Sequence, residues 1–409
     1  MNYSEQIYKF NSGLTLVFAK APNYYTSKIK VIFSVGAEDE KKPQGLAHLV
    51  EHCVFKGTSS RTQEEISSTF DKLAADASAS TSSEFTTYRV AFPRPNIEKV
   101  MDVLSDMLFN STFNQSEVEK EKQVILEEVK MRSDMPDTLA YDNLTKSMYK
   151  GTGLGMDIAG EEKELLKVKS QDMHEFVSNH YISPNTFISV VGDYDIKEVI
   201  NLIEKYFNSN LKQEGIKKVW TKPNKITKGE AKIYKPTAQS NMILAYNSPA
   251  HEDMDRIKFN VISNILGGSM SSRLFNKVRN ELSLCYNIYT FDINFKNNGI
   301  MAISLATSPE KAKEAYQTAQ NEVNKVLKEG VTDEEFDACK ELYLNQYLMM
   351  QDNPGTNLIY TAHTGKVLDK KSLIKLMQDM TKEECLDVFR KFVHEGEFFL
   401  SYVGKKIKL

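Results

Sequence analysis

The chain has few cysteines for its length. Its 409 residues include four, at Cys53, Cys285, Cys339 and Cys385. They form no C-x-x-C pair and no cluster, and a disulfide scaffold needs many more cysteines in a shorter chain. We therefore expect four reduced thiols.

An excess of charge of one sign is also missing. The sequence has 52 basic and 55 acidic side chains, for a formal net charge of −3. Proteins that bind polyanions or anionic membranes usually carry a clear excess of basic residues. The balance argues against nucleic acid and against a membrane as partners.

Long apolar runs are absent as well. No segment approaches the roughly 18 apolar residues that suggest a membrane-spanning helix. The first residues, MNYSEQIYKFNSGLTLVF, have neither the pattern of a secretory signal nor that of an Arg- and Ser-rich presequence. We infer a cytoplasmic protein.

The proportions of hydrophobic and charged residues are those of a folded protein. Hydrophobic residues make up 41% of the chain and charged residues 26%, with 19 glycines and 11 prolines, which excludes a largely disordered chain. At 409 residues, the chain exceeds the roughly 250 that one core usually supports. We expect two or three domains.

Strand and helix patterns alternate along the first half. Segments rich in β-branched and aromatic residues predict strands at 13–21, 28–39, 82–92 and 182–195. Helical periodicity predicts a helix after Pro43, one at 62–73, two between 97 and 131, and an amphipathic one at 196–207.

A change of composition separates the two halves. The segment from Leu211 to Lys232 carries seven lysines together with glycine and proline, which is typical of an exposed interdomain linker. A basic anion-binding patch is the alternative. We place an N-terminal lobe at 1–215, a linker at 216–232 and a C-terminal lobe at 233–409.

The second half repeats the element order of the first. Strands are predicted at 241–249, 286–293 and 300–307, helices at 253–266 and 271–282, and two further helices close the chain. Two halves of similar order, each about 200 residues long, indicate duplicated lobes. The predicted fold class is α+β, with each lobe a mostly antiparallel sheet packed with helices.

A candidate metal-binding motif is the segment His48-Leu49-Val50-Glu51-His52. Residues four apart on a helix share a face, so His48 and His52 can present two imidazoles to one metal ion. Glu51 lies near that face and can reach a water on the metal. The pattern H-x-x-E-H is the inverted zinc-peptidase helix, or inverzincin motif. A solvated face with two histidines is the alternative, but the chain has only seven histidines, which favours the metal site.

A third ligand is expected, because catalytic zinc usually takes three protein ligands. Glu121 and Glu128 lie seven residues apart, with Val124 and Ile125 between them on one helical face. A carboxylate beside apolar residues on an inward stripe makes Glu128 a ligand candidate. A solvated acidic face is the alternative and explains the other glutamates of the segment.

These residues resemble one peptidase family. GLAHLVEHCVFKGT at 45–58, followed by Glu128 in EKEKQVILEEVKMRSDMPD, resembles the pitrilysin and mitochondrial processing peptidase family of zinc metallopeptidases, in its short bacterial form. The resemblance continues through 181–195 and 266–291 and covers most of the chain. It implies a fold of two homologous α+β lobes.

The resemblance implies roles for the motif residues. His48, His52 and Glu128 would bind one Zn²⁺ per chain, and Glu51 would be the general base. Zinc lowers the pKa of its water to about 7, and Glu51 would take the proton and return it to the leaving amine. Glu121 fits the rule that a ligating imidazole donates its second N–H to a carboxylate.

Two groups of substrate contacts are implied in the same way. The first is an edge strand that pairs with extended peptide backbone and holds Ser78, Ala79, Thr81 and Ser82. The family usually has Asn where this chain has Ser78. The second is the pair Arg279 and Tyr286, with Tyr286 donating to the developing oxyanion.

These features together predict a zinc metalloendopeptidase that hydrolyses unfolded or extended peptides. Long family members enclose the substrate with four lobes, so a two-lobed chain predicts a clamshell homodimer. The zinc lobe of one protomer would face Arg279 and Tyr286 of the other. A heterodimer with a related subunit and a non-catalytic core or scaffold subunit are the alternatives, and the intact motif argues against the scaffold.

Overall fold

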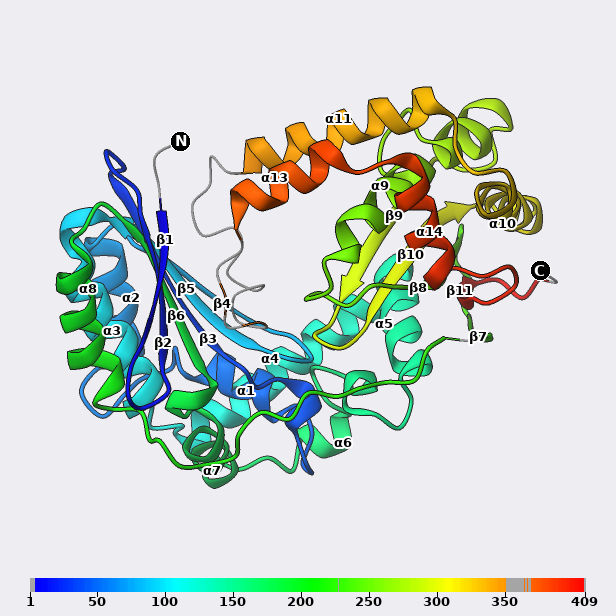
Figure 1. The fold of residues 1–409 in the computed structure, drawn as a ribbon. Coiled ribbons are helices and arrows are strands. Elements are labelled where there is room, and N and C mark those ends of the chain that lie inside the picture. The colour runs from blue at the N-terminus through cyan, green and yellow to red at the C-terminus, as the bar shows by residue number, and fades with distance from the viewer. Residues whose placement is uncertain (1–3, 227, 351–363, 365, 367–368, 408–409) are drawn as a thin grey trace. The chain divides into compact units, whose positions relative to one another are not determined.

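Two units, each built on one β-sheet, make up the computed structural model of the chain (Figure 1). The structure describes residues 4–226, 228–350, 364, 366 and 369–407. The first unit holds residues 4–129 and 152–221, and the second holds residues 130–151, 222–350 and 369–407. Helices pack on each sheet, so the predicted α+β class with two lobes is confirmed.

The first unit contains a six-stranded sheet in the order β1-β2-β6-β3-β5-β4. Its strands are β1 (Ser4–Lys9), β2 (Thr15–Lys20), β3 (Thr26–Phe33), β4 (Asp76–Thr81), β5 (Thr86–Pro93) and β6 (Thr186–Gly192). All neighbours are antiparallel except β2 and β6, which are parallel. Among the described strands, β4 pairs with β5 alone and so forms an edge of the sheet.

Helices cover one face of this sheet. They are α1 (Leu46–Cys53), α2 (Gln63–Lys72), α3 (Ile97–Asn110), α4 (Gln115–Ser133), α6 (Glu162–Leu165), α7 (Ser170–His180) and α8 (Ile196–Ile203). Figure 1 shows α2, α3 and α8 beside the sheet. Alternate strand residues such as Leu16, Val31 and Val90 join Leu104 and Ile203 from the helices in one buried core.

The opposite face of the sheet is covered in part by the segment predicted as a linker. Trp220 packs against the small cluster that includes Phe85. The Lys218 side chain is 4% exposed, and its Nζ lies 2.6 Å from Glu38 Oε1 and 2.5 Å from Asp39 Oδ2. The expectation of a fully exposed lysine-rich linker is therefore wrong at Lys218, because two buried carboxylates neutralise its charge.

The second unit contains a five-stranded sheet in the order β7-β11-β8-β10-β9. Its strands are β7 (Gly229–Tyr234), β8 (Ser240–Ser248), β9 (Asn287–Asn294), β10 (Gly299–Thr307) and β11 (Phe399–Gly404). Only β7 and β11 are parallel within it. The order and directions match β2-β6-β3-β5-β4 of the first sheet, as expected for duplicated lobes.

Helices of the second unit are α5 (Pro136–Met148), α9 (Asp255–Gly267), α10 (Ala312–Glu329), α11 (Asp333–Met350), α13 (Lys370–Asp379) and α14 (Lys382–Phe392), with a π-helical segment at Phe275–Glu281. Helix α5 comes from the first half of the chain but packs on β7, β8 and β11. Asn143 donates to Ala231 O and Ser401 Oγ, 3.1 Å from each. This packing places residues 130–151 in the second unit, so both units are discontinuous in the chain, whereas the sequence predicts two continuous lobes divided near 216–232.

The end of the chain also differs from the prediction. Within the described residues, four helices and β11 follow β10, whereas the sequence predicts two helices. Strand β11 pairs with β7 and β8 and so completes the second sheet as β6 does the first. A short strand such as FLSYVG has no partner within its own segment, so its pairing depends on distant residues.

None of the helices in the described part of the chain has the length and the apolar character of a membrane-spanning helix.

Candidate metal centre

Helix α1 presents the H-x-x-E-H motif on one face. Leu46, Leu49, Val50 and Cys53 are buried on the other face and join the core of the first unit. This apolar stripe follows the helical period and orients the helix on the sheet. His48, Glu51 and His52 therefore lie together on the remaining face, as their spacing predicts.

Three side chains converge beside this helix. His48 Nε2 lies 3.8 Å and His52 Nε2 lies 3.9 Å from Glu128 Oε2. The two imidazole rings have centroids 4.7 Å apart and planes at 81°. In the part of the chain that the structure describes, His48, His52 and Glu128 are the group of His, Cys, Asp and Glu side chains arranged to hold a metal ion.

The donor set suits zinc. Two imidazole nitrogens and one carboxylate oxygen are the ligands of catalytic zinc sites, which keep a further position open. Bonds of about 2.0–2.1 Å in a tetrahedral site place ligand atoms about 3.4 Å apart. The 3.8 and 3.9 Å separations therefore need a contraction of about 0.4–0.5 Å to close around the ion.

Glu121 contacts His52 at Nδ1, the ring nitrogen that is not directed at Glu128. Its Oε2 lies 3.1 Å from His52 Nδ1 and its Oε1 lies 2.9 Å from Lys56 Nζ. The Glu121 side chain is 7% exposed, so the lysine supplies the opposite charge that a buried carboxylate needs. This contact uses His52 Nδ1 and leaves Nε2 directed at Glu128, which is the orientation that a metal ligand requires.

Glu51 is held by the neighbouring edge strand. Thr81 Oγ1 donates a hydrogen bond of 2.9 Å to Glu51 Oε2. Burial raises the pKa of Glu51 because it disfavours the charged form, while the Thr81 hydrogen bond and the charge of His52 act in the opposite direction. Glu51 is thus beside the metal ligands without being one of the converging group.

The predicted substrate-contact strand is β4. Ser78 and Ala79 lie within it and pair with Arg89 and Tyr88 of β5, while Thr81 ends it. Arg89 Nε donates to Ser78 Oγ. The other edge of β4 pairs with no strand among the described residues. The Thr81 side chain reaches Glu51 of the motif helix. Ser82 follows the strand, and its backbone N–H donates to Phe85 O at 2.8 Å.

Arg279 and Tyr286 lie in the second unit. The Arg279 guanidinium carbon is 5.2 Å from the centroid of the Tyr286 ring and 4.4 Å from that of Phe275. Tyr286 is 79% exposed, so its ring is not packed in the core. The two side chains stack on one another at the surface of their own unit.

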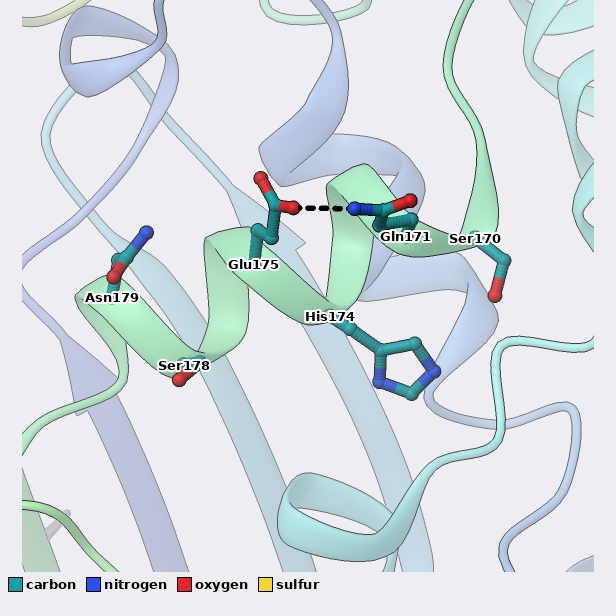
Figure 2. Close-up of a pocket in the computed structure, with 6 residues that line it drawn as sticks. All are labelled: Ser170, Gln171, His174, Glu175, Ser178 and Asn179. Carbon is teal, nitrogen blue, oxygen red and sulfur yellow. Dashed lines mark hydrogen bonds between the residues drawn. The ribbon is translucent and has the colours of Figure 1, made fainter.

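The remaining histidine pair in α7 holds no metal site. Figure 2 shows a surface depression lined by one face of this helix, where His174 points away from the hydrogen-bonded Gln171 and Glu175. His174 Nε2 lies 3.2 Å from Thr112 O. His180 is buried beside Phe176, and burial lowers its pKa to about 4. Both rings therefore have contacts within their own unit.

Comparisons with known proteins match both units. The family model described as insulinase (peptidase family M16) matches residues 15–162, and the model described as peptidase M16 inactive domain matches residues 167–343. A Rickettsia felis protein named uncharacterized zinc protease is 30% identical over 400 residues, or 96% of this chain and 95% of its own. The chain belongs to the peptidase M16 family.

Other M16 relatives cover most of the chain. The uncharacterized zinc protease YmxG of Bacillus subtilis is 29% identical over 91% of both chains. A crystal structure of a peptidase M16 inactive domain from Pseudomonas fluorescens superposes with a TM-score of 0.91 over 99% of both chains. A protease from Helicobacter pylori also gives 0.91, over 98% of this chain and 100% of its own. Both structures are 19% identical in sequence and therefore show the fold.

The structure adds contacts that the M16 motif alone did not indicate. Lys56 was not singled out in the sequence, although it lies four residues after His52 and so continues the same face past the helix end. Thr81 belongs to the predicted substrate-contact group, and its hydroxyl also donates to Glu51. Val124 was placed on the inward stripe beside Ile125, but its side chain is 49% exposed, so only Ile125 of the two is buried.

Proposed function

We propose that this chain is a zinc metalloendopeptidase that cleaves unfolded or extended peptides. The observation that carries the proposal is the convergence of His48, His52 and Glu128 beside a second carboxylate, Glu51, that is not part of the cluster. The zinc protease names of the relatives support the same chemistry. A cytoplasmic location stays a prediction from the sequence.

His48, His52 and Glu128 would hold one zinc ion per chain. The bound ion supplies a Lewis acid that makes water nucleophilic near neutral pH. Glu51 accepts the proton of the attacking water and delivers it to the leaving amine. Glu121 orients His52, and Thr81 orients Glu51 through the hydrogen bonds described above.

The substrate would add a strand to the edge of the first sheet. Strand β4 has a free outer edge among the described strands, and an extended peptide can hydrogen-bond to such an edge with little regard for its side chains. Ser78 and Ala79 would contribute this backbone pairing. Arg279 and Tyr286 would bind the substrate near the scissile bond, with Tyr286 donating to the oxyanion.

A non-catalytic core or scaffold role, and a heterodimer with a related subunit, are the alternatives. The words inactive domain describe the model that matches residues 167–343. The metal cluster lies outside that range, within residues 15–162 that match the insulinase model. The description therefore does not favour a scaffold over an enzyme.

Removing and restoring zinc tests the enzyme proposal. The purified chain should contain about one zinc per chain and cut an unfolded protein such as reduced, carboxymethylated casein, as seen by mass spectrometry of the products. Dialysis against a chelator should abolish cleavage, and adding about one equivalent of zinc should restore it. A zinc-loaded chain that cuts no peptide would support the scaffold role instead.

A homodimer with shared sites is part of the proposal. A chain with Glu51→Gln and a differently tagged chain with Arg279→Ala and Tyr286→Ala should each be nearly inactive alone. If each site uses the zinc unit of one protomer and the Arg/Tyr unit of the other, each mixed dimer holds one intact site and one doubly defective site. Co-expression and purification through both tags isolate the mixed dimers, and a peptide assay should then show about half of the activity of the unsubstituted dimer. No gain over either parent would contradict the shared site.

A further inference from the structure

The motif helix α1 begins without a capping side chain of its own. Its N-cap is Gly45, in the left-handed region with φ of 86°. A β-carbon at this position would lie 2.3 Å from Ala159 O, so the Ser, Thr, Asp or Asn that usually caps a helix does not fit. The first N–H groups of α1 therefore need an acceptor from elsewhere.

Glu40 supplies that acceptor. Its Oε2 accepts the Gly45 N–H and its Oε1 accepts the Ala47 N–H, each at 2.7 Å. The Glu40 side chain is buried, with the residue 5% exposed. Burial raises the pKa of Glu40 to about 8, and the two backbone N–H groups act against that rise because they stabilise the ionised carboxylate.

The loop that carries Glu40 is itself fixed to the sheet. Ala37 N–H donates to Ser82 O at 3.1 Å and Glu38 N–H donates to Ser83 O at 2.9 Å, at the end of β4. The ion pairs of Glu38 and Asp39 with Lys218 hold the same loop from the other side. Glu40 thus connects the turn between β4 and β5 to the first turn of α1.

We propose that Glu40 is a positioning residue for the metal centre. Ala47 N–H is one of its two donors, and the next residue along α1 is the ligand His48. By anchoring the first turn, Glu40 sets the height and rotation of the helix face that carries His48 and His52. The inference rests on the proposed zinc site but not on the proposed substrate.

Zinc affinity of the purified protein tests this role. In the Glu40→Gln variant the side chain keeps its volume, but an amide NH₂ replaces one of the acceptors and faces a backbone N–H. We expect the zinc dissociation constant, measured by competition with a chromophoric chelator, to rise about tenfold or more. The peptide assay should show a fall in kcat with little change in KM, because the Glu40 carboxylate accepts from N–H groups at the start of α1 and not from the edge strand that binds peptide.

The matched control removes a different helix cap in the same unit. Thr62 caps α2 by accepting the Glu65 N–H at 3.2 Å, and Thr62→Ala should lower the melting temperature by a few degrees. Its zinc affinity should stay within about twofold of the parent chain. Equal zinc affinities for Glu40→Gln and Thr62→Ala would overturn the proposal and leave Glu40 as a general stabilising residue.

Hydrogen exchange on the parent chain covers the case in which Glu40→Gln does not fold. Zinc should slow exchange at the Gly45 and Ala47 amides more than at the Glu65 amide in the α2 cap. Equal effects at both caps would overturn the inference. A parent chain that binds zinc but cuts no peptide defeats the proposed peptidase alone, whereas one that binds no zinc defeats both.

Discussion

Replacing Glu51 with Gln is expected to lower the rate of peptide hydrolysis by about 10²–10⁴-fold while zinc stays bound. The carboxamide cannot accept a proton from water, so the general-base contribution is lost. The three converging ligands are His48, His52 and Glu128, so the metal content should be unchanged. Steady-state assays on a quenched peptide, together with metal analysis of the same sample, measure both quantities.

The matched control for this variant is Glu64→Gln. Glu64 is exposed in the first turn of α2 and lies outside the metal cluster, so the same chemical change there should leave kcat within about twofold. Loss of zinc in Glu51→Gln would place Glu51 among the ligands. Retention of more than about a tenth of the activity would remove Glu51 as general base.

Replacing Glu128 with Gln is expected to weaken zinc binding by more than about 100-fold. A neutral amide oxygen is a poor substitute for the carboxylate in a site that otherwise offers two neutral imidazoles. Glu128 comes from α4, so its loss leaves His48 and His52 as a two-ligand site. Chelator competition gives the dissociation constant, and peptide hydrolysis should fall in parallel at low zinc concentration.

The neighbouring glutamate provides the control. Glu127 is exposed on the same helix, and Glu127→Gln removes the same charge from the same stretch of α4 without changing the cluster. It should bind zinc within about twofold of the parent chain. If Glu128→Gln binds zinc within tenfold of the parent, a different third ligand must hold the ion.

The helical part of the metal site followed directly from local periodicity. His48 and His52 are four apart, and any α-helix through them places both rings on one face. The structure has that helix and that face. The buried stripe of Leu46, Leu49 and Val50 was readable in the same way, because the helical period that selects the inward face also selects the outward one.

The third ligand needed more than periodicity. Glu128 lies on α4, and the pattern of that helix allowed either a ligand or a solvated acidic face. The apolar and polar residues of α4 do not separate clearly onto two faces, and Val124, on the same helix, is half exposed. Only the packing of α1 and α4 in one unit brings Glu128 Oε2 within 3.9 Å of both histidines.

Contacts between distant residues were the least predictable. Nothing local in the sequence pairs Lys218 with Glu38 and Asp39, so a buried ion pair looked like part of an exposed linker. Helix α5 follows α4 in the chain but packs on the second sheet, because its apolar residues cover β8 and β11 there. Such placements depend on which surfaces remain uncovered once the sheets have formed.

The α+β class, the two lobes and the inverted histidine motif could all be predicted from the sequence, because each depends on short-range periodicity or on a resemblance carried by contiguous residues. The carboxylates that meet the motif could be identified only from the packing of the folded chain. Glu128 joins the histidines, Glu121 and Lys56 support His52, and Glu40 caps the helix. These contacts join residues far apart in the chain, and a burial or charge pattern within one segment carries no information about the partner it will meet.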